Sequence, residues 1–363
     1  MRLFEETDFA GGTLKNRFVR ASVWMAGADE KGHLTQELLD HYKMLATGGA
    51  GLILTGYAYI SDEEQPNPGM LGIYDDSFIE EYRTLTDAVH REGAKIALQI
   101  VFGGSQSHHP DAGSMNILAP SSIENRVTGL MPKEATRDDI KRIVRLFGDA
   151  AYRAREAGFD GVQIHGAHGY FLSSFLTPFY NKREDEYNGD IHDRGRILYE
   201  VYEEVRSRVG ADFPIIYKIN WSDFMDTGEG LEFNDALQVF RELDRRGVDL
   251  FEVSAVNESS GKGMAPARKG IHSREKESYF REATAKIAKS VDAPVILMGG
   301  NRSVDVMEEI LNNTDIEYFS LGRPLLCETD LVNKWEQNSE YKPKCISCNQ
   351  CWTTTPNSCI LNR

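Results

Sequence analysis

Two histidines and a tyrosine lie close together in the segment HGAHGY, which begins at His165. His165 and His168 are separated by two residues, and Tyr170 follows two positions later. Two imidazoles can hydrogen-bond a developing oxyanion, and a phenol can deliver a proton to carbon. The same pattern also fits a structural histidine pair, or two zinc ligands without a recognisable third. The spacing therefore predicts an acid–base site and leaves both alternatives open.

Two glycine-containing segments near the end of the chain indicate a phosphate site. Gly299, Gly300 and Asn301 follow one apolar run, and Gly322 and Arg323 follow the next. Glycines let backbone N–H groups approach a phosphate, and an arginine supplies positive charge. Each segment alone is also typical of a tight turn, but two on successive strands together with Arg323 favour phosphate.

Lys218 interrupts the apolar run PIIYKIN. Burying a lysine in the mouth of a barrel costs free energy unless a negatively charged group pairs with it. The alternative is an ordinary exposed lysine at a strand end.

Four of the five cysteines are crowded near the C-terminus, at Cys345, Cys348, Cys351 and Cys359. Their spacing supplies enough thiolates for a zinc or iron–sulfur site. A reduced tail without metal is the alternative. Because the rest of the chain is almost free of thiols, a reducing compartment is favoured over a disulfide framework.

Short β-rich runs alternate with amphipathic segments over most of the chain. Apolar residues recur at helical spacing in, for example, residues 140–157 and 280–289. Eight strand–helix units with right-handed crossovers define a (β/α)8 barrel, so we predict an α/β fold of the TIM-barrel type. A doubly wound sheet is disfavoured because no GxGxxG follows the first strand. The expected strands are residues 18–23, 51–55, 95–100, 161–165, 214–219, 250–254, 294–298 and 317–321.

The domain organisation and the charge narrow the class of protein further. We expect a barrel over residues 1–340, a tail over 341–363, and long loops at 101–132 and 165–199 on the carboxyl face. The net charge of −15 disfavours nucleic acid and anionic membranes as partners. With no apolar run long enough to span a bilayer and no signal-peptide core, we expect a cytoplasmic homo-oligomer.

These motifs together resemble the old yellow enzyme family of FMN-dependent ene-reductases. The resemblance covers nearly the whole chain, although Trp24 and Phe102 depart from the family's pattern. Further pieces in the family's order are LKNRFVRAS from Leu14, YKIN around Lys218, MGGNRS from Met298 and SLGRPLL from Ser320. The loop after HGAHGY adds Phe175, Leu176, Pro178, Asn181, Arg183, Asp185, Tyr187 and Gly189.

The resemblance implies FMN bound noncovalently at the carboxyl face, with NADH or NADPH as reductant. Lys218 would lie near the N1/O2 edge of the flavin, and Gln99 would meet its pyrimidine edge. The expected cofactor contacts are Ser22, Gly56, Gln99, His165, Lys218, Gly300, Asn301, Gly322 and Arg323.

The implied reaction is hydride transfer from the flavin to the β-carbon of an activated alkene, a small-molecule substrate such as an enone. His165 and His168 would bind the substrate carbonyl while Tyr170 protonates the α-carbon. The cysteine tail resembles the iron–sulfur cysteines of the dienoyl-CoA reductase branch, with shorter spacings. Two other classes stay open: a metal-dependent barrel hydrolase or aldolase that uses the histidine pair and Lys218, and a barrel that only stores or senses flavin.

Overall fold

The computed structural model describes residues 1–10, 12–261 and 265–362. Parallel strands close into a barrel because β7 pairs with both β4 and β10. The predicted (β/α)8 barrel is confirmed. Around the barrel the strands are β3 (Phe18–Arg20), β4 (Leu52–Leu54), β7 (Lys95–Val101), β10 (Val162–Gly166), β11 (Ile215–Asn220), β12 (Leu250–Ser254), β13 (Val295–Leu297) and β14 (Tyr318–Leu321).

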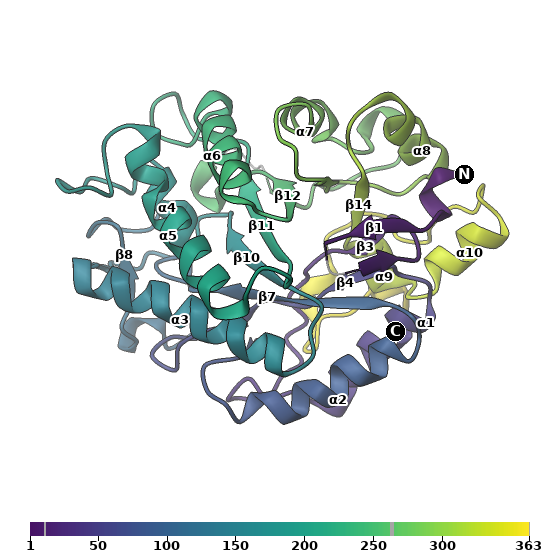
Figure 1. Ribbon diagram of the computed structural model, residues 1–363, viewed down its shortest axis with the longest axis horizontal. Helices are drawn as coiled ribbons and strands as arrows, with labels where there is room; N and C mark the ends of the chain where they lie inside the picture. The colour runs from purple at the N-terminus through teal and green to yellow at the C-terminus, as the bar shows by residue number, and fades with distance from the viewer. Residues whose placement is uncertain (11, 262–264, 363) are drawn as a thin grey trace.

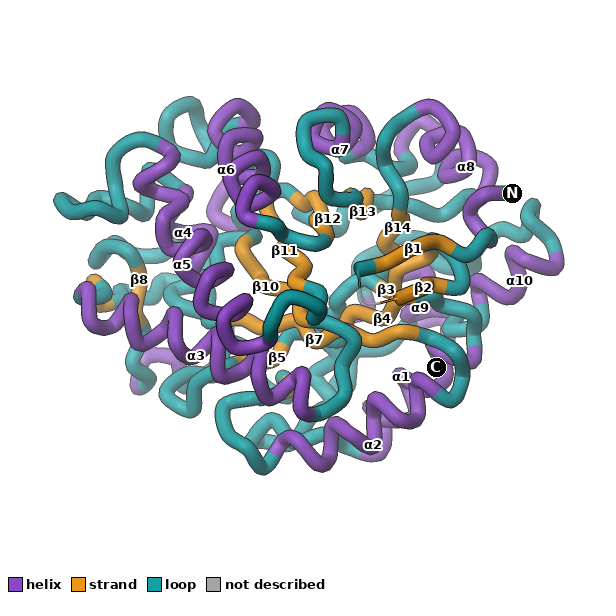
Figure 2. Tube along the Cα trace, viewed as in Figure 1, coloured by secondary structure: helices purple, strands orange, loops and turns teal. Residues whose placement is uncertain are grey.

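Amphipathic helices surround these strands (Figures 1 and 2). Helix α3 begins with a capping box, in which Thr136 accepts from the Asp139 amide and the Asp139 side chain accepts from the Thr136 amide. Helix α6 ends at Gly247, whose left-handed backbone (φ 97°) favours glycine. The main helices are α1 (Gln36–Thr47), α2 (Phe78–His90), α3 (Arg137–Glu156), α5 (Ile191–Val209), α6 (Phe233–Arg246), α7 (Arg281–Ala288), α8 (Val304–Asn313), α9 (Arg323–Cys327) and α10 (Leu331–Gln337).

An N-terminal hairpin of β1 (Thr7–Phe9) and β2 (Gly12–Leu14) closes the amino end of the barrel. Phe9 and Leu14 pack with inward-facing strand residues such as Val19, Ile216 and Ile296 in one buried cluster. Side chains alternate between the two faces of a strand, so the remaining strand residues pack outward against the helices. The carboxyl end is therefore the end left for a site.

Long loops cover the carboxyl end, as expected, but they contain more structure than the sequence indicates. Strand β8 (Leu118–Ala119) pairs with β9 (Lys133–Glu134) after β7, while β5 (Ala58–Tyr59) and β6 (Leu71–Gly72) extend the sheet beside it. The expected loop at 165–199 contains α4 (Phe171–Leu176) and the first turns of α5. These short elements satisfy backbone polar groups that a long buried loop would leave unpaired.

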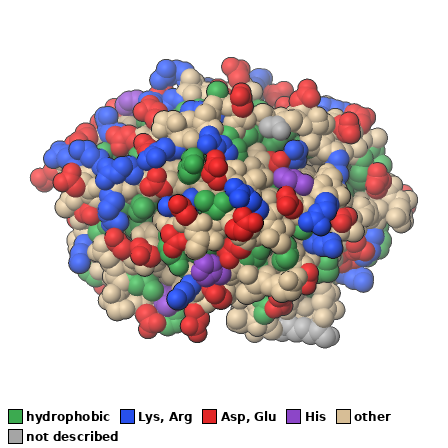
Figure 3. Space-filling model, turned by 60° about the horizontal axis from the view of Figure 1, so that its bottom comes forward, with side chains coloured by type: hydrophobic (Ala, Val, Ile, Leu, Met, Phe, Trp, Pro, Cys, Tyr) green, Lys and Arg blue, Asp and Glu red, His purple; other side chains and the backbone are tan. Residues whose placement is uncertain are grey.

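Charged side chains of both signs are interspersed over the face shown in Figure 3. Among the described residues, we find no helix with the length and apolar character needed to cross a membrane.

Candidate active site

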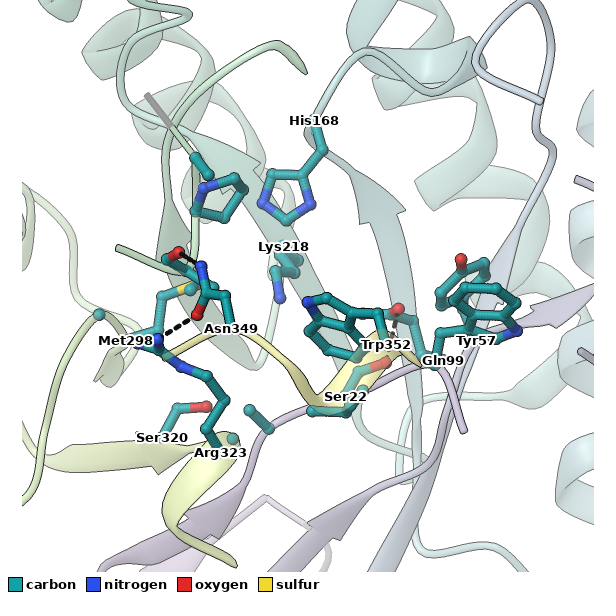
Figure 4. Close-up of a pocket in the computed structure, with 18 of the residues that line it drawn as sticks. Ser22, Tyr57, Gln99, His168, Lys218, Met298, Ser320, Arg323, Asn349 and Trp352 are labelled. Carbon is teal, nitrogen blue, oxygen red and sulfur yellow. Dashed lines mark hydrogen bonds between the residues drawn. The ribbon is translucent and has the colours of Figure 1, made fainter. Parts of the chain in front are cut away.

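A cavity of about 690 Å³ opens at the carboxyl ends of the barrel strands. Its volume is within the usual range for small-molecule and cofactor sites. Figure 4 shows side chains from several strands and from the C-terminal tail meeting there. The predicted site residues that line it are Ser22, Gln99, His165, His168, Tyr170, Lys218, Gly300, Asn301, Gly322 and Arg323.

Gly56 is the predicted contact that the structure does not bring to this cavity. Its backbone N–H donates to the Tyr42 hydroxyl, at 2.7 Å, and the next residue, Tyr57, lines the cavity instead. A Cβ at Gly56 would lie 2.9 Å from the carbonyl oxygen of Val23. Glycine is thus required here for close packing against the segment that follows β3, and a contact of Gly56 with the cofactor stays a prediction.

The HGAHGY segment brings its three polar rings together. The His165 ring lies 4.7 Å from that of Tyr170 and 5.1 Å from that of His168, centroid to centroid. The chain turns sharply after β10 because His168 and Gly169 both have left-handed backbones, with φ of 63° and 92°. Since only a few per cent of non-glycine residues adopt such a backbone, the strain at His168 is consistent with a functional position.

Both histidines are neutral in this environment. Burial, and then the nearby positive charge of Lys218, holds the pKa of His165 and of His168 well below the ordinary value. The amide of Ala167 donates to Nδ1 of His165 at 3.3 Å, so the proton of the neutral ring is on Nε2. His168 Nε2 lies 2.6 Å from the Ser254 hydroxyl. Each ring can therefore act as a neutral hydrogen-bond donor.

The lowered pKa of His165 predicts a pH dependence of stability. In the unfolded chain an imidazole titrates near 6.5, so below about that pH the unfolded state binds a proton that the folded state rejects. His165 therefore contributes stability that is present above about pH 6.5 and is lost as the pH falls. Between pH 7.5 and 5.5 the wild type should lose about 1.4 kcal/mol more unfolding free energy than His165→Gln in urea titrations. Equal losses in the two proteins would show that the pKa of His165 is the same in the folded and the unfolded chain.

Lys218 is buried in the cavity wall rather than exposed at a strand end. It is 4% exposed, and its Nζ lies 3.2 Å from Oε2 of Glu252, a buried carboxylate on β12. Nearby, the Ser22 hydroxyl donates to Oε1 of Gln99, at 2.8 Å. A cation, an amide and a hydroxyl thus lie together on one side of the cavity, where they can meet the polar edge of a heterocycle.

The other end of the cavity has the features of a phosphate site. Gly299 and Gly300 have left-handed backbones, and a Cβ at either would lie 2.7 Å from a carbon of the Tyr279 ring, so glycine is required. Arg323 is buried, and its guanidinium donates to the backbone carbonyl of Arg268 at 2.7 Å and to Oδ1 of Asn349. The Asn301 amide instead joins β13 to β14, donating to the Leu297 and Ser320 carbonyls at 2.8 and 3.1 Å.

The C-terminal tail packs against this end of the barrel. Asn357 donates through its side chain to the Trp24 carbonyl, at 2.8 Å, and the Gly270 amide donates to the Ser347 carbonyl at 3.1 Å. Trp352, which is 41% exposed, lines the cavity together with Asn349. The tail therefore contributes part of the cavity wall.

The structure does not support the predicted metal site at Cys345, Cys348, Cys351 and Cys359. Within the residues that the structure describes, no group of three or more His, Cys, Asp or Glu side chains could hold a metal ion. Cys345 and Cys359 instead pack in an apolar cluster with Cys327, while Cys351 packs in the main core. Burial raises the pKa of Cys345, and that of Cys351 to about 11, which favours thiols over metal-binding thiolates.

Several cavity residues were not assigned to the site from the sequence. The Tyr170 hydroxyl donates to that of Tyr57, at 3.3 Å, and the Asn67 amide donates to the same Tyr57 oxygen at 2.9 Å. His108 also lines the cavity, with Nε2 3.1 Å from Oε2 of Glu258. Tyr57 lies just beyond the carboxyl end of β4, and active-site residues of such barrels lie at the carboxyl ends of strands. This place in the sequence could have identified it.

The structure is a parallel (β/α)8 barrel whose carboxyl face carries buried cations, neutral histidines and a glycine-lined pocket, features that suit an anionic small-molecule ligand. Residues 2–342 match the model of the NADH:flavin oxidoreductase / NADH oxidase family, and the chain belongs to that family. The resemblance inferred from the HGAHGY segment and the late glycine motifs is thereby confirmed.

Similar proteins agree with this assignment. An NADH oxidase of Thermoanaerobacter brockii is 32% identical over 350 residues, covering 96% of this chain and 52% of the relative. An NADPH dehydrogenase of Clostridium acetobutylicum is 33% identical over 326 residues, which cover 90% of this chain and 92% of the relative. The solved old yellow enzyme homologue from Zymomonas mobilis has the same fold, with a TM-score of 0.80 and 23% identity. The match covers 99% of this chain and 100% of that one. The chain spans about half the length of the first curated relatives it matches.

Proposed function

We propose that this protein is an FMN-dependent NAD(P)H oxidoreductase that reduces the C=C bond of an activated alkene such as an enone. The observation that carries the proposal is the meeting of His165, His168 and Tyr170 in the same cavity as buried Lys218 and Arg323. The first three residues supply donors for a carbonyl and a proton for carbon. The two cations supply an anionic cofactor with positive charge in a chain whose net charge is −15.

The residues present fit FMN at both of its ends. Arg323 and the backbone N–H groups at Gly299 and Gly300 would hold the phosphate, because Arg323 makes charge-assisted hydrogen bonds and successive backbone N–H groups bind anions. Lys218 and Gln99 would hold the polar edge of the flavin ring. When bound, FMN accepts hydride from a reduced nicotinamide and passes hydride to the alkene.

Three side chains of this protein would orient the substrate and deliver a proton to it. Nε2 of His165 donates to the substrate carbonyl; for His168 to donate through Nδ1, the Ser254 hydroxyl donates to Nε2. Both hydrogen bonds draw electron density from the C=C bond. Burial raises the pKa of Tyr170 above its ordinary value, so its hydroxyl carries the proton that is delivered to carbon.

A steady-state assay tests the activity. Under anaerobic conditions, oxidation of NADH or NADPH should depend on an added enone, and the product should be the saturated ketone. Nicotinamide oxidation without any dependence on an alkene would overturn the proposed substrate class.

Arg323→Ala tests the phosphate end of the site. Loss of a charge-assisted hydrogen bond removes about 1.5–3 kcal/mol, so the Kd for FMN should rise roughly tenfold or more. Lys269→Ala, a basic residue in the same region that does not line the cavity, is the matched control. A fluorescence titration of the apoprotein with FMN measures both, and an unchanged Kd for Arg323→Ala would remove this residue from the phosphate site.

The metal-dependent hydrolase or aldolase is disfavoured by the residues around the histidine pair. His165 Nδ1 accepts from a backbone amide, and His168 Nε2 is paired with Ser254. Nζ of Lys218 is engaged by the buried carboxylate of Glu252, whereas a Schiff base requires an amine that is free to attack a carbonyl.

A further inference from the structure

A chain of buried polar side chains crosses the barrel beneath the cavity. Nε2 of Gln99 donates to Oε1 of Gln163, at 2.5 Å, and Nε2 of Gln163 donates to Oε2 of Glu252, at 3.0 Å. Gln99 in turn accepts from Ser22. These residues come from β7, β10 and β12 and from the segment after β3. The chain ends at Glu252.

Glu252 is fully buried, with 0% exposure, and it organises the groups that line the cavity without lining the cavity itself. Its Oε2 accepts from Gln163 and lies 3.2 Å from Nζ of Lys218, and its Oε1 accepts from the Ser320 hydroxyl at 2.6 Å. A buried carboxylate is costly unless it is paired and hydrogen-bonded, and here each oxygen has a partner. Because it reaches the cavity only through other side chains, Glu252 is a positioning residue.

The charge of Glu252 offsets that of Lys218 at the point where the flavin ring would lie. Reduction of a flavin adds negative charge to its ring, which a nearby cation stabilises. A carboxylate 3.2 Å from Nζ weakens that stabilisation, and the effect is strong because both side chains are buried away from water. Lys218 therefore holds the ring without greatly favouring its reduced form.

We propose that Glu252 sets the reduction potential of the bound flavin by neutralising Lys218, and that it keeps this potential low. The inference rests on the proposed function, since it requires FMN in the cavity. A low potential makes the reduced cofactor a stronger hydride donor toward the alkene.

Glu252→Gln tests the inference because it changes the charge and keeps the shape. The amide oxygen can still accept from Gln163 and Lys218, and its NH2 group can donate to the Ser320 hydroxyl, which rotates to accept. In the FMN-loaded enzyme, the affinity for reduced over oxidised flavin should rise at least about tenfold, equivalent to about +30 mV for a two-electron couple. Equilibration with a reference dye during anaerobic reduction measures this potential.

Asp223→Asn is the matched control. Asp223 is also a buried carboxylate and accepts from Thr177, Asn220 and the Leu231 amide, but it does not line the cavity or contact Lys218. The reduction potential of the flavin bound to Asp223→Asn should equal that of the wild type. A flavin potential that is unchanged in Glu252→Gln, or that shifts equally in both variants, would overturn the inference.

The double variant Lys218→Gln/Glu252→Gln provides a test that leaves no unpaired charge in the barrel, should Glu252→Gln not fold. If the two charges offset one another, the double variant's ratio of affinities for reduced over oxidised flavin should stay within about threefold of that of the wild type. This corresponds to about 15 mV in the potential. A tenfold fall would show that Lys218 acts without opposition from Glu252. Absence of flavin binding by the wild type would instead contradict the proposed function itself.

Discussion

Replacing Tyr170 by Phe should slow reoxidation of the reduced enzyme by an enone about 10²- to 10⁴-fold, the usual contribution of a positioned general acid. Reduction of the enzyme by NADH or NADPH should be nearly unchanged, because hydride transfer to the flavin needs no proton from Tyr170. The structural basis is the buried Tyr170 hydroxyl, whose pKa is raised by burial and which lies beside the His165 ring. Stopped-flow absorbance of the flavin measures the two half-reactions separately.

Tyr57→Phe is the control for this experiment. This substitution removes the Tyr57 hydroxyl, which accepts from Tyr170, and leaves the Tyr170 hydroxyl in place. Its reoxidation should be slowed far less than that of Tyr170→Phe. Equal slowing of both half-reactions by Tyr170→Phe would argue against proton donation and for a general disturbance of the cavity.

His168→Ala should lower kcat/KM for the enone about 10²- to 10³-fold, as expected for loss of one preorganised donor to a developing oxyanion. The geometry supports this role because His168 is held by Ser254 and is kept neutral by burial and by Lys218. His168→Asn retains an N–H donor of similar reach and should recover part of the loss. The same kcat/KM in both variants would mean that the imidazole acts in some other way than as a donor.

The barrel could be predicted from the sequence because each strand is an apolar run between amphipathic segments. The expected strand at 250–254 coincides with β12, whereas the expected strand at 18–23 is longer than β3, which ends at Arg20. In the segment that follows, Ala26 has a positive φ, which residue type does not indicate because alanine rarely adopts this backbone.

The clustering of His165, His168 and Tyr170 could be predicted because these residues are adjacent in sequence, but contacts between distant residues could not. The Lys218–Glu252 pair joins two strands, and its distance depends on the register of β11 against β12, in which Lys218 is opposite Glu252. The place of Trp352 in the cavity depends on how the tail folds back across the barrel. The homo-oligomer and the cytoplasmic location stay predictions.

The cysteine tail shows where spacing alone misleads. Three closely spaced thiols and a fourth nearby are typical of a metal site, yet side-chain direction decides whether their sulfur atoms converge. Positive φ at Ser347 and Asn349 turns the backbone between the cysteines. Cys345 and Cys359 pack with Cys327, whereas Cys351 packs in the main core.

A single-turnover experiment with the wild-type protein tests the central claim most directly. FMN-loaded enzyme is reduced anaerobically with one equivalent of NADH or NADPH and is then mixed with an enone. We expect the yellow colour of the flavin to bleach on reduction and to return with the enone, with one equivalent of saturated ketone formed. Failure to bind FMN, or a reduced flavin that stays bleached in the presence of every activated alkene tested, would contradict the account.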